Sequence, residues 1–317
     1  MRPGSCTCPF LLALFLLAAC DTGGNTDETS PTVETGPPAT GAKLVGVWNV
    51  PAQDLATVAS YGFTAVFYAA RGPDDAVAYL EAAAAVGTLR VVLNLLPSTA
   101  MVDPACAAER GTHGCPFSLE AYAASFEAYR DRGLEQYSDV LYAHMMMDEP
   151  FDPSNWGGTP MTYEQLRAAS ALSREVLGEV PTAINAGYVP PTLEPGVADV
   201  VMSTFYANKE RQYESVEVYL QDQLENLQTA RAANPSLRYI LLLQAIGDGV
   251  FGPFPTAEAM EAKATAACQT EGVDGVFWWT WSKPQATDFG TVLRGAEGAA
   301  YRAMVARVAT VCNGTRG

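Results

Sequence analysis

Residues 140–150 read Val-Leu-Tyr-Ala-His-Met-Met-Met-Asp-Glu-Pro, a mostly apolar run that ends in two acids and a proline. A run of this length and composition is typical of a parallel strand that is buried on both faces. A loop containing Gly and Pro follows, and residues 162–177 then place apolar side chains at helical spacing. The stretch therefore predicts a strand, a loop and a helix, which is one unit of an α/β fold.

The same unit recurs on both sides of this stretch. The expected strands are residues 44–50, 63–69, 89–96, 140–147, 182–186, 199–206, 239–245 and 275–281. The expected helices are residues 51–61, 74–86, 118–130, 162–177, 215–233, 256–270 and 297–311. The connection 188–197 holds three prolines and is expected to lack a full helix. Eight units within residues 43–313 favour a single-domain (β/α)8 TIM barrel, which typically takes about 250 residues, over an open doubly wound sheet.

The N-terminal segment has the pattern of an export signal. Residues 1–20 contain Arg2, an apolar run too short to span a bilayer, and Leu17-Ala-Ala-Cys20, which resembles a bacterial lipobox. An ordinary secretory signal with a chance Cys is the alternative. Residues 21–42 are rich in Thr, Gly, Pro and acids and predict a disordered linker. We therefore expect a signal peptide, lipidation at Cys20, and a protein anchored in the bacterial cell envelope, outside the cytoplasm, with the choice of membrane open.

Composition excludes several classes of partner. The formal net charge is −16, from 19 Lys and Arg against 35 Asp and Glu, and such a surface does not suit nucleic acid. Two histidines are too few for a histidine-rich metal site. Neither a Gly-x-Gly-x-x-Gly motif after the first strand nor a Walker motif is present. We expect no cofactor and no metal, and a monomer.

Four cysteines remain once those of the signal are set aside: Cys106, Cys115, Cys268 and Cys312. Four cysteines allow three pairings, and an exported protein meets an oxidising compartment. We favour Cys106–Cys115, which closes a short loop, and Cys268–Cys312, which ties the last helix to the one before it. The spacings do not match zinc motifs.

Polar and aromatic side chains collect where the predicted strands end. They are Trp48, Asn49, Tyr68, Asn94, Asp148, Glu149, Asn185, Tyr206, Gln244, Trp279 and Trp281. Solvent exposure alone would favour Lys, Ser and Glu at such positions. Amides satisfy sugar hydroxyls, and flat aromatic faces cover the apolar face of a pyranose, so the pattern predicts a carbohydrate site at the carboxyl ends of the strands.

Several of these segments resemble the glycoside hydrolase barrels of clan A and their Asp-Glu-Pro relatives. The resemblance rests on Met147-Asp-Glu-Pro150 at the end of the fourth strand, on residues 198–206, on Leu241-Leu-Leu-Gln-Ala-Ile, on Pro255-Thr-Ala-Glu and on Gly275-Val-Phe-Trp-Trp-Thr-Trp281. It covers most of residues 43–313 through short motifs. It implies that Glu149 is the general acid/base of a glycosidase and that Asp148 is its charged partner. A salt-bridged carboxylate at the rim is the structural alternative for Glu149.

The sequence departs from this resemblance at the end of the seventh strand. Retaining members have a glutamate nucleophile there, whereas this chain has Gln244, and a neutral amide cannot form the glycosyl-enzyme ester. Three explanations stay open. The adjacent Asp148–Glu149 pair is similar to hexosaminidases, in which the substrate's own 2-acetamido oxygen attacks. An acid on a loop, Asp248 or Asp288, could act as base or nucleophile. Catalysis could also be lost, which leaves a non-catalytic glycan-binding surface lipoprotein with a degenerate hydrolase fold.

His144 lies four residues before Asp148. A metal site made of His144, Asp148 and Glu149 is conceivable, but with only one other imidazole in the chain we interpret His144 as a satisfied core histidine. The sequence as a whole predicts a glycoside hydrolase-like protein that acts on an extracytoplasmic glycan.

Overall fold

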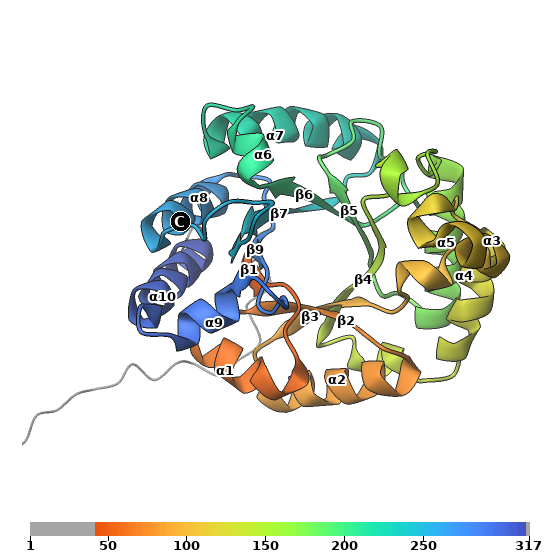
Figure 1. Cartoon of the computed structure of the whole chain (residues 1–317), viewed down its shortest axis with the longest axis horizontal. Coiled ribbons are helices and arrows are strands. Elements are labelled where there is room, and N and C mark those ends of the chain that lie inside the picture. The colour runs from red at the N-terminus through yellow and green to blue at the C-terminus, as the bar shows by residue number, and fades with distance from the viewer. Residues whose placement is uncertain (1–41, 315–317) are drawn as a thin grey trace, which may run out of the picture. The chain divides into compact units, whose positions relative to one another are not determined.

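Eight parallel strands close into a barrel in the computed structural model, which describes residues 42–314 (Figure 1). In order around the barrel the strands are β1 (Leu44–Val47), β2 (Ala65–Ala69), β3 (Arg90–Asn94), β4 (Leu141–Asp148), β5 (Thr182–Gly187), β6 (Val200–Phe205), β7 (Arg238–Gln244) and β9 (Gly275–Trp279). Closure comes from β9, which pairs in parallel with both β7 and β1. The predicted (β/α)8 TIM barrel is confirmed.

The N-terminal predictions fall outside the described part of the chain. The signal peptide, the lipidation of Cys20 and the linker up to residue 41 concern residues outside that part, so they stay predictions. Within residues 42–314, none of the helices has the length and apolar character needed to cross a bilayer.

The expected helices form between the strands, with small differences at their ends. They are α1 (Leu55–Ser60), α2 (Pro73–Val86), α4 (Leu119–Phe126), α5 (Tyr163–Leu177), α7 (Val216–Ala233), α8 (Ala257–Gln269) and α10 (Gly298–Gly314). The connection between β5 and β6 contains no helix, as its prolines predicted. The loops add three short helices and a two-stranded antiparallel ribbon that the sequence did not predict. These are α3 (Pro104–Arg110), α6 (Ala207–Glu210), α9 (Phe289–Arg294) and the pair β8 (Ile246–Gly247) and β10 (Thr287–Asp288).

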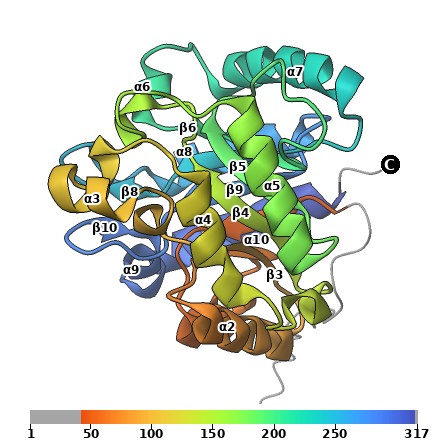
Figure 2. The ribbon, with the colours of Figure 1, turned by 90° about the vertical axis from the view of Figure 1, so that its right-hand side faces the viewer.

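Helix α5 shows how the local sequence sets the boundaries of an element. The Thr162 side chain accepts a hydrogen bond from Gln165 N at 3.2 Å, and the Gln165 side chain accepts one from Thr162 N at 2.9 Å. This reciprocal capping box satisfies two of the backbone N–H groups that a helix start leaves without partners. Leu166, Ala169 and Leu177 then line the buried face of α5, which lies beside α4 against the barrel (Figure 2).

Alternate residues of each strand point into the barrel and out toward the helices. The inner layer consists of Leu44, Trp48, Ala65, Phe67, Val92, Ala143, Met145, Ala183, Val200, Met202, Ile240, Leu242 and Phe277. The space is full: a Cβ on Gly46 would lie 2.4 Å from the Phe277 ring. Because the interior is packed, a ligand can bind only at an end of the barrel.

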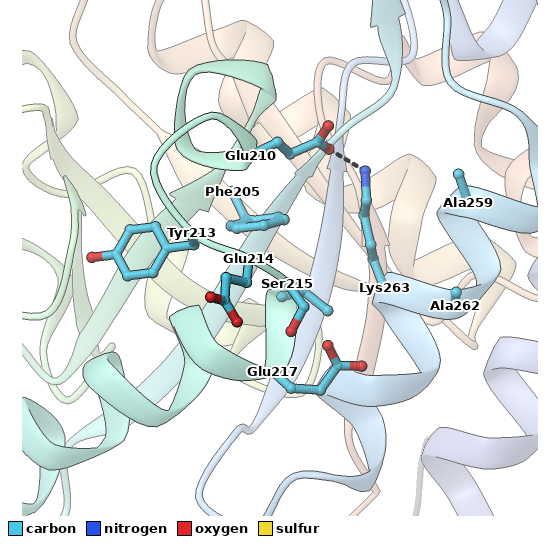
Figure 3. Close-up of a pocket in the computed structure, with 10 residues that line it drawn as sticks. Phe205, Glu210, Tyr213, Glu214, Ser215, Glu217, Ala259, Ala262 and Lys263 are labelled. Carbon is cyan, nitrogen blue, oxygen red and sulfur yellow. Dashed lines mark hydrogen bonds and ion pairs between the residues drawn. The ribbon is translucent and has the colours of Figure 1, made fainter.

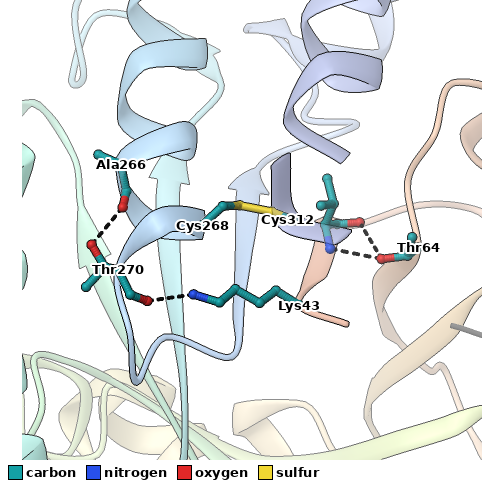
Figure 4. Close-up of a disulfide and its surroundings, with 7 residues drawn as sticks. Lys43, Thr64, Ala266, Cys268, Thr270 and Cys312 are labelled. Carbon is teal, nitrogen blue, oxygen red and sulfur yellow. Dashed lines mark hydrogen bonds between the residues drawn. A yellow bond between two sulfur atoms is a disulfide. The ribbon is translucent and has the colours of Figure 1, made fainter. Parts of the chain in front are cut away.

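Both favoured disulfides are confirmed. Cys106–Cys115 joins Cα atoms 5.9 Å apart within the loop after β3. Cys268–Cys312 joins Cα atoms 4.8 Å apart and ties α8 to α10, as Figure 4 shows. Near this bridge Lys43 donates to Thr270 O at 2.6 Å, which anchors the chain just before β1 to the end of α8. The final helix is therefore fastened to the barrel by a covalent bond as well as by packing.

Candidate functional site

The two acids at the carboxyl end of β4 lie in the barrel mouth. Strand register sets Asp148 beside Asn185 of β5, and Asn185 Nδ2 donates to Asp148 Oδ1 at 2.7 Å. The Asp148 side chain remains open to solvent, yet the surrounding protein desolvates it and raises the pKa of this carboxyl to about 6. The Asn185 hydrogen bond lowers the pKa and the nearby charge of Glu149 raises it. Asp148 thus changes charge close to neutral pH, as acids in functional sites often do.

Glu149 follows in a backbone conformation that residues other than glycine seldom adopt. Its φ is 49°, and three hydrogen bonds fix the peptide groups around it. Glu149 N donates to Asn185 O at 2.7 Å, while Glu149 O accepts from Asp152 N and from Trp156 Nε1, both at 3.1 Å. The residue is thus held between β5 and the loop that follows β4.

The Glu149 carboxylate has a neutral hydrogen-bond partner. Asn155 Nδ2, in the 3-10 turn η6 (Pro153–Asn155), donates to Glu149 Oε2 at 3.1 Å. Across the described part of the chain, no Lys or Arg forms an ion pair with Glu149. The interpretation of Glu149 as a salt-bridged rim residue is therefore wrong. Glu149 is also partly exposed to solvent.

An aromatic wall stands next to the two acids. Tyr206 stacks on Trp279 with ring centroids 5.6 Å apart, and Phe251 meets both rings edge-on at 5.8 and 5.1 Å. Burial raises the pKa of the Tyr206 hydroxyl well above its usual value, with smaller contributions from the charges of Asp148 and Glu149. The peptide bond after Trp279 is cis. Tyr206 therefore joins the acidic and aromatic parts of the mouth.

A lysine that the sequence analysis did not single out lies over this wall. Lys283 Nζ is 4.8 Å from the Trp279 ring centroid and 5.8 Å from that of Phe251, and it pairs with Asp248 at 3.4 Å. Three residues near the two acids come from loops, which have no strand-end pattern: Phe251, Lys283 and Asn155. Periodicity alone could not have found these three residues.

The other predicted site residues divide into two groups. Asn94, on the inner face of β3, donates to Met145 O at 3.2 Å, and half-buried Asn49 follows the inner residue Trp48, which stacks on Phe67. These residues share the mouth with Asp148. Tyr68 and Trp281 do not, because both pack in the outer layer against helices.

The contacts of these two outer residues are specific. Tyr68 stacks on Tyr79 of α2 and donates to Asp75 at 2.8 Å. Trp281 is fully buried and donates to Asp54 at 2.7 Å.

Gln244 occupies the expected place at the end of β7, beside Trp279, but its amide is already bound to the backbone. Oε1 accepts from Ala207 N at 3.0 Å, and Nε2 donates to Ile246 O at 2.9 Å and to Phe251 O at 3.2 Å. Gln244 therefore ties the start of α6 to the loop that carries Phe251. Its two N–H donors have no capacity left for a ligand.

The two loop acids considered as nucleophile or base also bind the backbone. Asp248 accepts from Val250 N and Phe251 N, both at 2.8 Å, and these bonds, with that of Phe251 the largest, help lower the pKa of its carboxyl. Asp288 caps α9 by accepting from Thr291 N at 2.8 Å and also accepts from Lys283 N at 3.0 Å. Asp148, by contrast, keeps an oxygen free of any protein donor within residues 42–314.

His144 lies in the core, as interpreted. Its Nδ1 is 2.7 Å from Ser173 Oγ, its ring stacks on Phe126, and burial lowers the pKa of the imidazole to about 3. In the described residues no group of three or more His, Cys, Asp or Glu side chains could hold a metal ion.

A separate depression lies on the helical side of β6. It is lined by Phe205, Tyr213, three glutamates and Lys263, which pairs with Glu210 (Figure 3). It shares no residue with the mouth, and its acids face solvent as a charged helix surface does.

Comparison with known proteins reveals likeness in fold only. Neither a protein-family model nor a curated protein matches the sequence. A GH5_18 variant from Streptomyces cattleya, solved with Manβ1-4GlcNAc, has a TM-score of 0.55 at 17% identity, covering 87% of this chain and 81% of that one. A GH30 endoxylanase from Clostridium papyrosolvens has a TM-score of 0.52 at 13% identity, covering 88% and 72%.

A GH2 β-galacturonidase from Eisenbergiella tayi has a TM-score of 0.56 at 15% identity, covering 83% of this chain. This chain spans about half the length of that enzyme, 51% of it being covered. The fold of residues 42–314 is thus a (β/α)8 barrel like that of the similar glycoside hydrolases, whereas the chemistry must be argued from the site.

Proposed function

We propose that this protein is a glycoside hydrolase in which Glu149 donates the proton to the glycosidic oxygen. The observation that carries the proposal is the placement of Glu149 at the carboxyl end of β4, half-exposed, without a cationic partner in the described chain and next to Asp148. Active sites of this fold lie at that end of the barrel. The aromatic wall of Tyr206 and Trp279 offers the flat apolar surface on which a sugar ring packs. The similar solved structures include several glycoside hydrolases, which supports a carbohydrate ligand.

The mechanism that fits this mouth uses a nucleophile from the substrate. Gln244 is a neutral amide bound to the backbone, and the carboxylates of Asp248 and Asp288 accept backbone N–H groups. Asp148 is the acid that remains beside Glu149. On a sugar with a 2-acetamido group, the amide oxygen forms the bond to the anomeric carbon while Glu149 protonates the departing oxygen.

Asp148 accepts a hydrogen bond from the N–H of the acetamido group. Its negative charge stabilises the positive charge that develops on the ring formed by the amide oxygen and the anomeric carbon. Water then attacks the anomeric carbon, the bond from that carbon to the acetamido oxygen breaks, and Glu149 takes a proton from the attacking water. Because Asp148 must be ionised for this role, activity rises with pH through its pKa of about 6.

The experiment is hydrolysis of aryl glycosides, with and without a 2-acetamido group, by the purified protein. Glu149→Gln should lower kcat by about 10²–10⁴-fold, the usual contribution of general acid catalysis, and preserve glycan binding. The matched control is Glu179→Gln, because Glu179 is exposed and precedes the amino end of β5, at the opposite end of the barrel from the mouth. Full activity of the Glu149→Gln protein would disprove the assignment, and preference for sugars without the acetamido group would disprove substrate assistance.

A non-catalytic glycan-binding protein is the second candidate. It is favoured by one observation: the strand-end position of Gln244 is built into the backbone rather than offered to a ligand. In that case the wild-type protein binds glycans without turnover, and Trp279→Ala weakens binding while Glu149→Gln leaves it intact. For either candidate, we further propose that the protein is a monomer tethered through Cys20 to the cell envelope, which supports action on an extracytoplasmic glycan.

A further inference from the structure

We infer that Asn155 is a positioning residue for Glu149, and that the loop closed by the Cys106–Cys115 disulfide keeps Asn155 in place. This inference rests on the proposed function for its catalytic meaning and on contacts within the described chain for its geometry. It assigns a role to a covalent bridge that lies outside the mouth.

The first step is the contact with Glu149 itself. The segment 155–157, here called the clasp, touches the glutamate twice. Asn155 Nδ2 donates to Glu149 Oε2 at 3.1 Å, and Trp156 Nε1 donates to Glu149 O at 3.1 Å. One bond orients the carboxylate and the other holds the backbone, which has a φ of 49°. A single short segment therefore fixes both ends of the residue.

The second step links the clasp to the disulfide loop. Gly157 N donates to His113 O at 3.1 Å, within the turn η3 (Thr112–Gly114) that precedes Cys115. A Cβ on Gly157 would lie 2.8 Å from the carbonyl carbon of Cys115 and 2.9 Å from Pro116 N. Gly157 also has a φ of +63°, so both its conformation and its surroundings require glycine.

The third step is burial of the clasp's aromatic residue. Trp156 is 3% exposed and meets Phe117 edge-on with ring centroids 6.0 Å apart. Phe117 follows Cys115 by two residues and forms a β-bridge with Val102. The disulfide loop thus holds the clasp through the bond from Gly157 to His113, and Phe117, just beyond Cys115, supports Trp156 by packing. Trp156 in turn holds Glu149.

These contacts set the direction of the Glu149 carboxylate. Within the described chain, Asn155 Nδ2 is the side-chain donor that binds Glu149 Oε2. Loss of this donor therefore frees the Glu149 side chain to rotate away from the glycosidic oxygen that it is proposed to protonate. Asn155→Asp replaces the donor by a negatively charged group of the same shape, which repels the carboxylate, and should act in the same direction more strongly.

The test compares Asn155→Ala, Asn155→Asp and the control Gln228→Ala, since Gln228 is an exposed amide on α7. With the aryl glycoside that the wild-type protein hydrolyses, Asn155→Ala should lower kcat about tenfold with little change in KM. Asn155→Asp should lower kcat further, again with little change in KM. Gln228→Ala should change neither kcat nor KM. Unaltered kcat in Asn155→Ala would overturn the positioning role.

Hydrogen exchange tests the support without needing turnover. In the double variant Cys106→Ser/Cys115→Ser, and in Gly157→Ala, the amides of residues 149–158 should exchange at least tenfold faster than in the wild-type protein. The double variant Cys268→Ser/Cys312→Ser is the matched control and should leave that peptide unchanged. Unchanged exchange in the first two variants would overturn the role of the disulfide loop. Absence of turnover in the wild-type protein, with the exchange result as expected, would instead refute the proposed enzyme and keep the clasp.

Discussion

Asp148→Asn should make the protein more stable at neutral pH, because the folded state holds this carboxyl in a place that disfavours its charge. Desolvation raises the pKa of Asp148 to about 6 from an ordinary 3.8. Between these two pH values the folded protein keeps a proton that the unfolded chain has lost. Stability therefore falls as pH rises through this window, and the whole penalty is present above pH 6.

The size of the effect follows from the pKa difference. A pKa of about 6 against 3.8 corresponds to about 3 kcal/mol at most, and solvent screening of an open side chain reduces this to about 1 kcal/mol. Asparagine keeps an oxygen that can accept the Asn185 hydrogen bond of 2.7 Å. Asp148→Asn should therefore gain about 1 kcal/mol at pH 7–8 and nothing near pH 3.5.

Urea unfolding followed by tryptophan fluorescence at pH 3.5, 5, 6 and 7.5 would measure the difference. Glu179→Gln, at an exposed site, should show no comparable pH dependence. A difference that is constant across pH, or a variant that is less stable than the wild-type protein at pH 7.5, would refute the reasoning. Asp148→Asn should also lose turnover, because Asp148 is the acid proposed to stabilise the positive charge that develops in the reaction.

Three further predictions concern the scaffold. Removing Cys268–Cys312, which spans 44 residues, should lower the free energy of unfolding by about 4 kcal/mol, and removing Cys106–Cys115, which spans nine, by about 2.6 kcal/mol. The urea midpoints of the two Ser double variants would show this order. His144 stays neutral in the folded protein but gains a proton in the unfolded chain, so between pH 6.5 and about 3 the free energy of unfolding should fall by up to about 1.4 kcal/mol per pH unit as the pH falls. In acid unfolding curves, His144→Gln should reduce this pH dependence. Gly46→Ala should cost about 1–3 kcal/mol in chemical denaturation because its methyl group would enter the Phe277 ring, whereas Gly249→Ala, with open space around it, should cost less.

The barrel was predictable because its strands are recognisable in the sequence by their apolar composition. Residues 140–150 and 275–281 are apolar runs of strand length, and helices with capping residues such as Thr162 separate the runs. The two acids at the end of β4 were predictable from the same pattern. Strand ends in a closed parallel barrel meet at one rim, so Asp148 and Asn185 had to be neighbours.

The sequence did not predict correctly the direction in which two of the site side chains point. Alternation along β2 turns Phe67 inward and therefore Tyr68 outward, and Trp281 lies two residues beyond the end of β9. The loops were beyond prediction for a different reason. Asn155 and Phe251 reach the mouth through turns whose path depends on distant contacts, such as that of Gly157 with His113. No periodic signal in a sequence encodes such a contact.

The hydrogen bonds of Gln244 also determine what a carboxylate would meet at the end of β7. Gln244→Glu would place one there without changing the length of the side chain. Yet the new oxygen would face the carbonyl oxygens of Ile246 and Phe251, which now receive the two amide N–H groups. The substitution would thus set lone pairs against lone pairs, at a cost of about 1–3 kcal/mol for each group left without its partner. A carboxylate nucleophile at this position would therefore require a different path of the loop after β7, which now depends on the two amide N–H groups of Gln244.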